Sequence, residues 1–253
     1  MIHSTAIVDK SAVIGQNVEI GPYAIIGESV TIGDGSIIGP HAIIECSSIG
    51  KNCKIFGHAI IGTEPQHLKY GGEKTRTVIG DGTVIREYVT VNRATGTNET
   101  IVGKNCLLMA YTHVAHDSIV GNNVIIANAC AIAGHVQIHD NVIFGGMSAI
   151  HQFARVGRNA IIGAGSKVSM DVIPFAQTHG DRARLVGLNL IGLKRHQIPS
   201  ETIEAIKHAY RILFMSKLTL EEALSKLAAD PFKEVQEIIS FIKTSQRGII
   251  RNR

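Results

Sequence analysis

Residues 102–168 read VGKNCLLMAYTHVAHDSIVGNNVIIANACAIAGHVQIHDNVIFGGMSAIHQFARVGRNAIIGAGSKV. A large apolar residue recurs at every sixth position of this stretch, and a smaller residue follows four positions later. The same period runs through residues 2–61, with one slip before Ile49, and returns at residues 79–91. A fixed period sustained over this length is the signature of a solenoid. The large residues of the quoted stretch are Val102, Leu108, Val114, Val120, Ile126, Ile132, Ile138, Phe144, Ile150, Val156, Ile162 and Val168.

One large and one small inward residue per six positions fit a narrow, three-sided parallel β-helix with 18 residues per coil. Glycine often follows the large residue and asparagine recurs nearby, as at Gly121 and Asn123. Both residue types tolerate the positive φ that sharp corners require. Successive coils of such a β-helix stack about 4.8 Å apart. We therefore expect an all-β solenoid over residues 1–174.

Two insertions interrupt the period, at residues 63–78 and 92–101, and we expect them to leave the solenoid as loops on a binding face. The period ends at Pro174, after which we expect a connecting segment over 175–198 and a helical domain over 199–253. Thr219 and Glu222 have the spacing of a capping box, and Asp230-Pro231 is expected to begin the last helix. The helices would cover the open end of the solenoid.

Composition excludes several classes of protein. Hydrophobic residues make up 45% and charged residues 18% of the 253, which argues against disorder. There is no apolar run of about 18 residues that would span a membrane, no signal-peptide pattern, and no CxxC pair among the four cysteines. We therefore expect a cytoplasmic protein.

Charge is concentrated in the last quarter of the chain. Residues 194–253 contain 11 Lys and Arg against 7 Asp and Glu, whereas residues 1–193 contain 14 of each. The basic tail either attracts an acidic partner or is an ordinary solvated helical surface. The neutral, aromatic-poor solenoid has no basic stripe or stacking platform, so nucleic-acid binding is not expected.

The period also predicts which side chains point inward. Cys53, Cys106 and Cys130 occupy the small inward position, which indicates a structural role, and Cys46 lies off that position without a motif around it.

Four histidines fall instead on outward positions. With 18 residues per coil, the residue at 116 lies beneath Gly134, and Gly134 lies beneath Gln152. An imidazole cluster on one edge suits proton transfer near neutral pH. The four are His113, His116, His135 and His151.

Outward positions beside the histidines are apolar, where exposed solenoid surface would carry charge. An apolar outward face predicts burial against a second copy of the chain, so that the histidines line a cleft between subunits. These positions are Met109, Ala110, Tyr111, Ala127, Ala129, Ala131 and Ala133.

Two chemistries fit clustered histidines: a zinc site, or metal-free catalysis in which one imidazole acts as a general base. No Ser or Cys is placed beside them as a nucleophile, which favours direct transfer over a covalent intermediate.

Four segments carry a resemblance to a known family, namely residues 113–117 (HVAHD), 133–136 (AGHV), 150–153 (IHQF) and 192–195 (GLKR). With the hexads, both insertions and the tail, the whole chain resembles the UDP-N-acetylglucosamine O-acyltransferases. The resemblance implies a left-handed β-helix, an exception to the right-handed crossover rule, assembled as a homotrimer. It implies transfer of a 3-hydroxyacyl chain from acyl carrier protein to the glucosamine 3-position of UDP-N-acetylglucosamine, in lipid A biosynthesis and without a cofactor.

The resemblance also implies roles for individual residues. His116 matches the general base, and the Gly134 N–H matches an oxyanion donor. Asp117 either orients His116 or is a corner residue. The remaining matches are the substrate-binding positions Gln66, His67, Lys69, His113, His135, His151, Gln152, Asn189 and Arg195, and the position associated with acyl-chain length, Ala164.

Three positions depart from the family pattern, and one of them is Ala164, where some relatives have Gly. His67 stands where some members have Asp, and Ile191 where some have Glu. These departures leave open whether the acceptor carries a hydroxyl or an amine at the 3-position. The basic tail would attract the acidic carrier protein through Lys194, Arg195, Lys207, Arg211 and Arg247.

A zinc hydratase and a purely structural solenoid are the alternatives to acyl transfer. Zinc hydratases of the gamma carbonic anhydrase kind are also left-handed solenoids, but their ligands come as one His and then a distant pair separated by four residues. Here two residues separate His113 and His116, and His135 follows, a spacing that disfavours zinc. A purely structural solenoid would explain the hexads but neither the outward histidines nor the two insertions.

Overall fold

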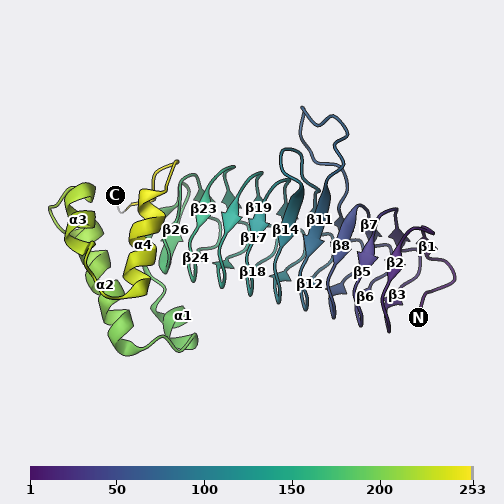
Figure 1. The fold of residues 1–253 in the computed structure, drawn as a ribbon, viewed down its shortest axis with the longest axis horizontal. Coiled ribbons are helices and arrows are strands. Elements are labelled where there is room, and N and C mark those ends of the chain that lie inside the picture. The colour runs from purple at the N-terminus through teal and green to yellow at the C-terminus, as the bar shows by residue number, and fades with distance from the viewer. Residues whose placement is uncertain (252–253) are drawn as a thin grey trace.

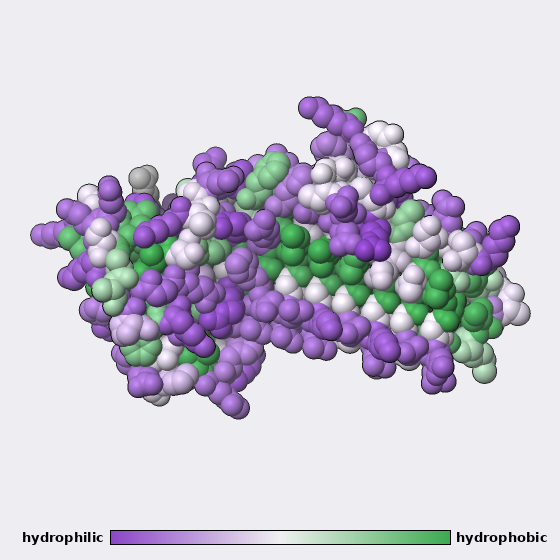
Figure 2. Space-filling model, viewed as in Figure 1, coloured by the Kyte–Doolittle hydropathy of each residue, from purple (hydrophilic) through white to green (hydrophobic). Residues whose placement is uncertain are grey.

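The computed structural model describes residues 1–251. The chain forms a left-handed parallel β-helix, and its helices are gathered at the C-terminal end of the solenoid (Figure 1). Figure 2 shows an apolar band and a hydrophilic edge that both run along the solenoid. The three sides of the prism are three sheets, called here the first, second and third sheet.

The first sheet consists of β1 (Ile7–Val8), β4 (Ile25–Ile26), β7 (Ile43–Ile44), β10 (Ile60–Ile61), β13 (Thr90–Val91), β16 (His113–Val114), β19 (Ala131–Ile132), β22 (Ala149–Ile150) and β25 (Lys167–Val168). The second sheet consists of β2 (Val13–Ile14), β5 (Thr31–Ile32), β8 (Ser47–Ile49), β11 (Arg76–Ile79), β14 (Glu99–Val102), β17 (Ile119–Val120), β20 (Gln137–Ile138) and β23 (Arg155–Val156). The third sheet consists of β3 (Glu19–Ile20), β6 (Ile37–Ile38), β9 (Lys54–Ile55), β12 (Val84–Ile85), β15 (Leu107–Leu108), β18 (Ile125–Ile126), β21 (Ile143–Phe144), β24 (Ile161–Ile162), β26 (Ala176–His179) and β27 (Arg184–Leu188).

The strand register confirms the predicted coil. Where both strands lie within residues 102–168, each outward strand residue pairs with the residue 18 positions further on, as Ile119 does with Gln137. The second residue of most strands is a fully buried aliphatic side chain, and these side chains form one continuous core. The cysteines follow the prediction as well, because Cys53, Cys106 and Cys130 are buried free thiols and Cys46 is partly exposed.

The three corners of the prism carry different side chains. The corner between the second and third sheets has exposed ion pairs, such as Lys51 with Asp34 at 2.8 Å and Lys104 with Asp81 at 2.9 Å. The corner between the third and first sheets has a column of near-parallel rings with centroids 4.9–5.1 Å apart. This ring column consists of Tyr23, His41, His58, Tyr88 and Tyr111.

Both insertions leave the prism at the remaining corner, between the first and second sheets, and Figure 1 shows a long loop rising from the solenoid beside β11. They are shorter than predicted, because β11 begins at Arg76 and β14 at Glu99. These two strands are four residues long and pair over their whole length, from Arg76 with Glu99 to Ile79 with Val102. The last residues of each predicted insertion therefore belong to the second sheet.

Residues 175–198 have more structure than the predicted connecting segment. β26 pairs in parallel with β24 and antiparallel with β27, which extends the third sheet past Pro174. The short helix α1 (Leu190–Arg195) follows, capped by the side chain of Asn189. Backbone groups at the last coil thus find partners in a hairpin instead of remaining an open edge.

The helical domain consists of α2 (Ser200–Met215), α3 (Leu220–Leu227) and α4 (Lys233–Lys243). The predicted capping box is present, with Thr219 and Glu222 bonded reciprocally. α4 is tied to the last coils by the Arg155 guanidinium, which donates to the Phe241 carbonyl at 2.8 Å and to Asp171 at 3.0 Å. No helix among residues 1–251 is long and apolar enough to cross a membrane.

The prediction that Asp230-Pro231 begins the last helix is wrong. Asp230 Oδ1 accepts a hydrogen bond from the Phe232 N–H at 3.0 Å, which closes a turn of the kind that Asp favours. α4 then starts at Lys233, with extended backbone at Phe232.

Candidate active site

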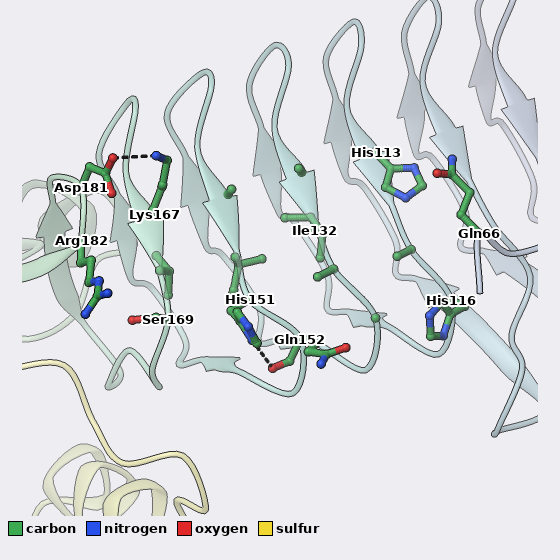
Figure 3. Close-up of a pocket in the computed structure, with 17 residues that line it drawn as sticks. Gln66, His113, His116, Ile132, His151, Gln152, Lys167, Ser169, Asp181 and Arg182 are labelled. Carbon is green, nitrogen blue, oxygen red and sulfur yellow. Dashed lines mark hydrogen bonds and ion pairs between the residues drawn. The ribbon is translucent and has the colours of Figure 1, made fainter. Parts of the chain in front are cut away.

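A groove of about 670 Å³ runs along the outer face of the first sheet, and its lining residues come from consecutive coils (Figure 3). Its floor follows the strand register, in which His113 pairs with Ala131, Ala131 with Ala149, and Ala149 with Lys167. Two small apolar side chains thus separate an imidazole from an ammonium group. Such a floor accommodates an extended apolar chain with polar groups at its two ends.

His116 stands at the corner beside this groove, on the turn that follows β16. Only 8% of the residue is exposed, although it points away from the solenoid core. The burial comes from the first insertion, because the His67 ring packs edge-on against the His116 ring with centroids 4.8 Å apart. Gln66 of the same insertion also lines the groove.

Asp117 performs both of the roles that the sequence left open. Its backbone is in the left-handed region, with φ at 60°, so it makes the corner. Its side chain also lies 2.7 Å from Nδ1 of His116. Because an ionised carboxylate only accepts hydrogen bonds, Nδ1 carries the proton and the lone pair of the imidazole is on Nε2. His116 is therefore held in the tautomer that a general base needs.

The second insertion surrounds the Asp117 carboxylate with hydrogen-bond donors. Backbone N–H groups of Thr95, Gly96 and Thr97 donate at 3.1, 3.0 and 2.6 Å, and the hydroxyls of Thr95 and Thr97 lie at 2.9 and 2.7 Å. Burial acts to raise the pKa of Asp117, but the hydrogen bonds from His116 and these threonines outweigh it and hold the pKa well below its usual range. The carboxylate is therefore ionised throughout the physiological pH range.

Gly134 lies against the His116 ring, as the 18-residue coil predicts. A Cβ at this position would be 2.6 Å from Cε1 and 2.8 Å from Nε2 of His116. Among residues 1–251, no group accepts a hydrogen bond from the Gly134 N–H, and Gly134 lines the groove. An unpaired N–H beside an imidazole is suited to binding an oxyanion.

His113 and His135 lie close to His116. Nδ1 of His113 lies 2.7 Å from the Thr90 hydroxyl, and burial followed by the proximity of His116 lowers the pKa of His113. His135 stacks on Phe153 with centroids 4.7 Å apart. Burial also lowers the pKa of His135, against the opposing effect of the Asp117 charge. Both rings are therefore biased toward the neutral form, which suits hydrogen bonding to substrate.

At the far end of the groove, Nζ of Lys167 pairs with Asp181 at 2.6 Å, and Arg182 and Ser169 complete the lining. Figure 3 places His151 and Gln152 midway between this pair and His116. Nδ1 of His151 lies 3.2 Å from the Gln152 carbonyl oxygen.

The structure brings most of the candidate residues into one place but separates four of them. Lys69 is exposed on the first insertion, and Ala164 is exposed at the corner between β24 and β25. Arg195 lines a different hollow of about 390 Å³, with Ile191 and residues of the third sheet. Asn189 is buried and engaged within the protein, because its amide donates to the Asn159 carbonyl and accepts from the Gly192 N–H, both at 2.8 Å.

Three side chains of the site also have the donor atoms of a metal centre. His116, Asp117 and His135 each bring one potential ligand atom within 4.8 Å of the others. A metal ligand must direct a free lone pair at the ion, whereas both oxygens of Asp117 already accept from the threonine loop and from His116. The arrangement therefore fits a hydrogen-bonded general base better than a zinc centre.

Comparisons with known proteins agree with this arrangement. A model of bacterial transferase hexapeptide repeats matches residues 11–46 and 99–134, which places the solenoid among the hexapeptide-repeat transferases. A second model, described as UDP-N-acetylglucosamine O-acyltransferase domain 2, matches residues 171–250.

Relatives match over nearly the whole chain. Proteins named acyl-[acyl-carrier-protein]--UDP-N-acetylglucosamine O-acyltransferase are 57% identical in Chlorobaculum parvum, over 98% of this chain and 96% of that one, and 54% identical in Aquifex aeolicus, over 99% and 98%. The structure of a UDP-N-acetylglucosamine acyltransferase from Bacteroides fragilis superimposes with a TM-score of 0.97 at 42% identity, over 99% of this chain and 100% of that one. The chain belongs to the UDP-N-acetylglucosamine O-acyltransferase family, and it is an acyltransferase.

Sequence reasoning missed two groups of site residues. Lys167 could have been found, because it follows His113, Ala131 and Ala149 at steps of 18 along one outward row. Thr95 and Thr97 could not, because an insertion has no period from which to compute where its side chains lie.

We expect Gly134→Ala to lower kcat by about 100-fold, because the added Cβ displaces the His116 ring and small misplacements of a catalytic group cost about that much. The measurement is steady-state kinetics beside a thermal unfolding curve. Gly187→Ala is the matched control, since a Cβ there meets no atom within 4 Å. Wild-type kcat in Gly134→Ala would contradict the close approach of the two residues.

Proposed function

We propose that this protein transfers a 3-hydroxyacyl chain from acyl carrier protein to the 3-hydroxyl of UDP-N-acetylglucosamine, the reaction that opens lipid A biosynthesis. The names of its relatives state the carrier thioester and the sugar nucleotide. The observation that carries the proposal is the His116–Asp117 pair beside the unpaired Gly134 N–H at the head of an apolar groove.

The geometry supports a direct transfer. Nε2 of His116 accepts the proton of the sugar hydroxyl while the hydroxyl oxygen attacks the thioester carbonyl. The Gly134 N–H donates to the oxyanion that forms. When the tetrahedral intermediate collapses, the carbon–sulfur bond breaks and the carrier thiolate takes the proton back from His116. Asp117 stays ionised throughout and stabilises the imidazolium.

The charges around the groove favour a hydroxyl acceptor over an amine. An amino sugar is partly cationic near neutral pH and would gain from a free carboxylate beside His116. The described residues offer none, because Asp117 is occupied by the second insertion and Asp181 by Lys167. His67, where some family members have Asp, adds an imidazole and not a negative charge.

The positions of the other candidate residues support a homotrimer. His116 and the groove are on the first sheet, whereas Arg195, Ile191 and the third-sheet residues share a second hollow. If the first sheet of one copy faces the third sheet of the next, both sets of residues reach one cleft. The ring column lies at the corner where these two sheets meet, and Tyr23 and Tyr111 are 58% and 63% exposed in a single copy.

Size-exclusion chromatography with multi-angle light scattering at micromolar protein should give three times the chain mass of 27.2 kDa. A monomer at that concentration would contradict the shared cleft.

The basic tail is proposed to receive the carrier protein. Arg195 and Arg211 line neighbouring hollows that share Leu188 and Leu190, and both side chains are exposed. Arg247 is less available, because its guanidinium donates to the Ser169 carbonyl at 3.1 Å. We retain the cytoplasm as the expected location, where free thiols such as the four cysteines stay reduced.

Mass spectrometry of a reaction with 3-hydroxyacyl carrier proteins of several chain lengths and UDP-N-acetylglucosamine tests the proposal. We expect one monoacylated sugar nucleotide, and we expect His116→Ala to lower its rate of formation by about 10²–10⁴-fold, the usual contribution of a general base. His3→Ala, at an exposed histidine far from the groove in the sequence, is the matched control.

Variants and a second acceptor in the same experiment test carrier docking and the choice of acceptor. Reversal of Arg195 and Arg211 to Glu should raise KM for the carrier more than KM for the nucleotide, and equal effects would argue against docking. Product with only a 3-amino acceptor would overturn the hydroxyl assignment. Absence of product with either acceptor would overturn the proposed function.

A further inference from the structure

The second insertion is built around a single carboxylate. Asp117 is the corner residue of the following coil, and its side chain is 0% exposed beneath residues 92–98. Thr95, Gly96 and Thr97 all direct their backbone N–H groups at it, and Thr95 and Thr97 add their hydroxyls. Five donors from one short loop therefore converge on one side chain. The connection of β13 to β14 does not by itself require these five hydrogen bonds.

The two oxygens of Asp117 have different partners. Oδ1 accepts from the N–H groups of Gly96 and Thr97 and from the Thr97 hydroxyl. Oδ2 accepts from the Thr95 hydroxyl at 2.9 Å, from the Thr95 N–H at 3.1 Å and from Nδ1 of His116 at 2.7 Å, and Nε2 of His135 lies 3.6 Å from it. Thr95 and His116 thus share one oxygen, which makes the Thr95 hydroxyl a direct competitor for the electron density that holds the imidazole.

We propose that Thr95 and Thr97 are positioning residues that clamp Asp117 in place and disperse its charge, and thereby set the pH at which His116 becomes available as the base. This proposal rests on the proposed function, since it assigns a role for His116 in acyl transfer. Charge-assisted hydrogen bonds are stronger than neutral ones and take up part of the acceptor's charge. With both hydroxyls in place, Asp117 fixes the orientation of His116 without binding the imidazolium so tightly that the free base is lost.

The titratable groups that face His116 are one carboxylate and three imidazoles. Within residues 1–251, Asp117 is the one carboxylate in contact with the ring, and His135 and His67 pack against it with centroids 5.3 and 4.8 Å away. His113 on β16 is close enough for its own pKa to be lowered in part by His116. These imidazoles disfavour a further positive charge, so the attraction of Asp117 is the main force that opposes them.

The test replaces the hydroxyls and keeps the shape. Thr95→Val removes the hydroxyl that donates to Oδ2 and keeps the Thr95 N–H, and the double variant Thr95→Val/Thr97→Val removes both hydroxyls. The more concentrated charge on Asp117 should bind the imidazolium more strongly. We expect the acid limb of the kcat/KM profile to move up by about half a pH unit or more in Thr95→Val, further in the double variant, with KM for the nucleotide within about twofold of wild type.

Two variants separate this role from loop stability. Thr95→Ser keeps a hydroxyl and should restore the wild-type profile. Thr75→Val removes a hydroxyl that donates to the Ala94 carbonyl at 2.5 Å, so it loosens the same loop without touching Asp117. We expect Thr75→Val to leave the acid limb in place, whatever it does to thermal stability.

The titration of His116 can also be read without turnover. Protein labelled with ¹³C at histidine Cε1, assigned by comparison with His116→Gln, gives the midpoint of His116 in the absence of substrates. A midpoint that rises in Thr95→Val and not in Thr95→Ser supports the clamp. A midpoint and acid limb that do not move, or that move equally in Thr75→Val, would overturn it. Failure of the wild-type protein to form product would overturn the proposed function instead and leave this titration as the test of the clamp.

Discussion

Every feature of the site depends on the way in which the parallel strands stack. Backbone hydrogen bonds between coils hold the register at 18 residues over the site, so an outward residue lies directly over its counterpart one coil away. A slip of a single residue would turn every side chain to the opposite face. This constraint places Gly134 against His116, aligns Ala131 with Ala149 in the floor of the groove, and brings Asp117 and His135 to the same corner. The groove is assembled from four consecutive coils of the first sheet, at β16, β19, β22 and β25.

The two insertions bury His116 and Asp117, which lie at a corner of the coils. A corner residue such as His116 is normally solvated, and an exposed imidazole–carboxylate pair would be screened by water. The first insertion covers His116 with His67, and the second surrounds Asp117 with donors. Burial strengthens the electrostatic interactions within the pair. The solenoid thus sets the positions of His116 and Asp117, and the two insertions set their environment.

The fold and much of the candidate site follow from periodicity, because a position in the hexad gives both the direction of a side chain and its neighbours one coil away. On this basis the buried cysteines and the contact between residue 116 and Gly134 were predictable. The threonine loop, the hairpin of β26 and β27, and the cap by Asn189 were not, since each depends on where an aperiodic segment folds back. The turn at Asp230 shows the same limit, because a residue pair typical of a helix start closes a turn two residues earlier.

A direct transfer with His116 as the general base requires that no residue of the protein carries the acyl group. Intact-mass spectrometry after incubation with 3-hydroxyacyl carrier protein alone, without an acceptor, is the decisive measurement. We expect the mass of the chain to stay unchanged at every time point. A stable increase equal to one 3-hydroxyacyl group, lost when the sugar nucleotide is added, would contradict it and would require a covalent acyl-enzyme intermediate.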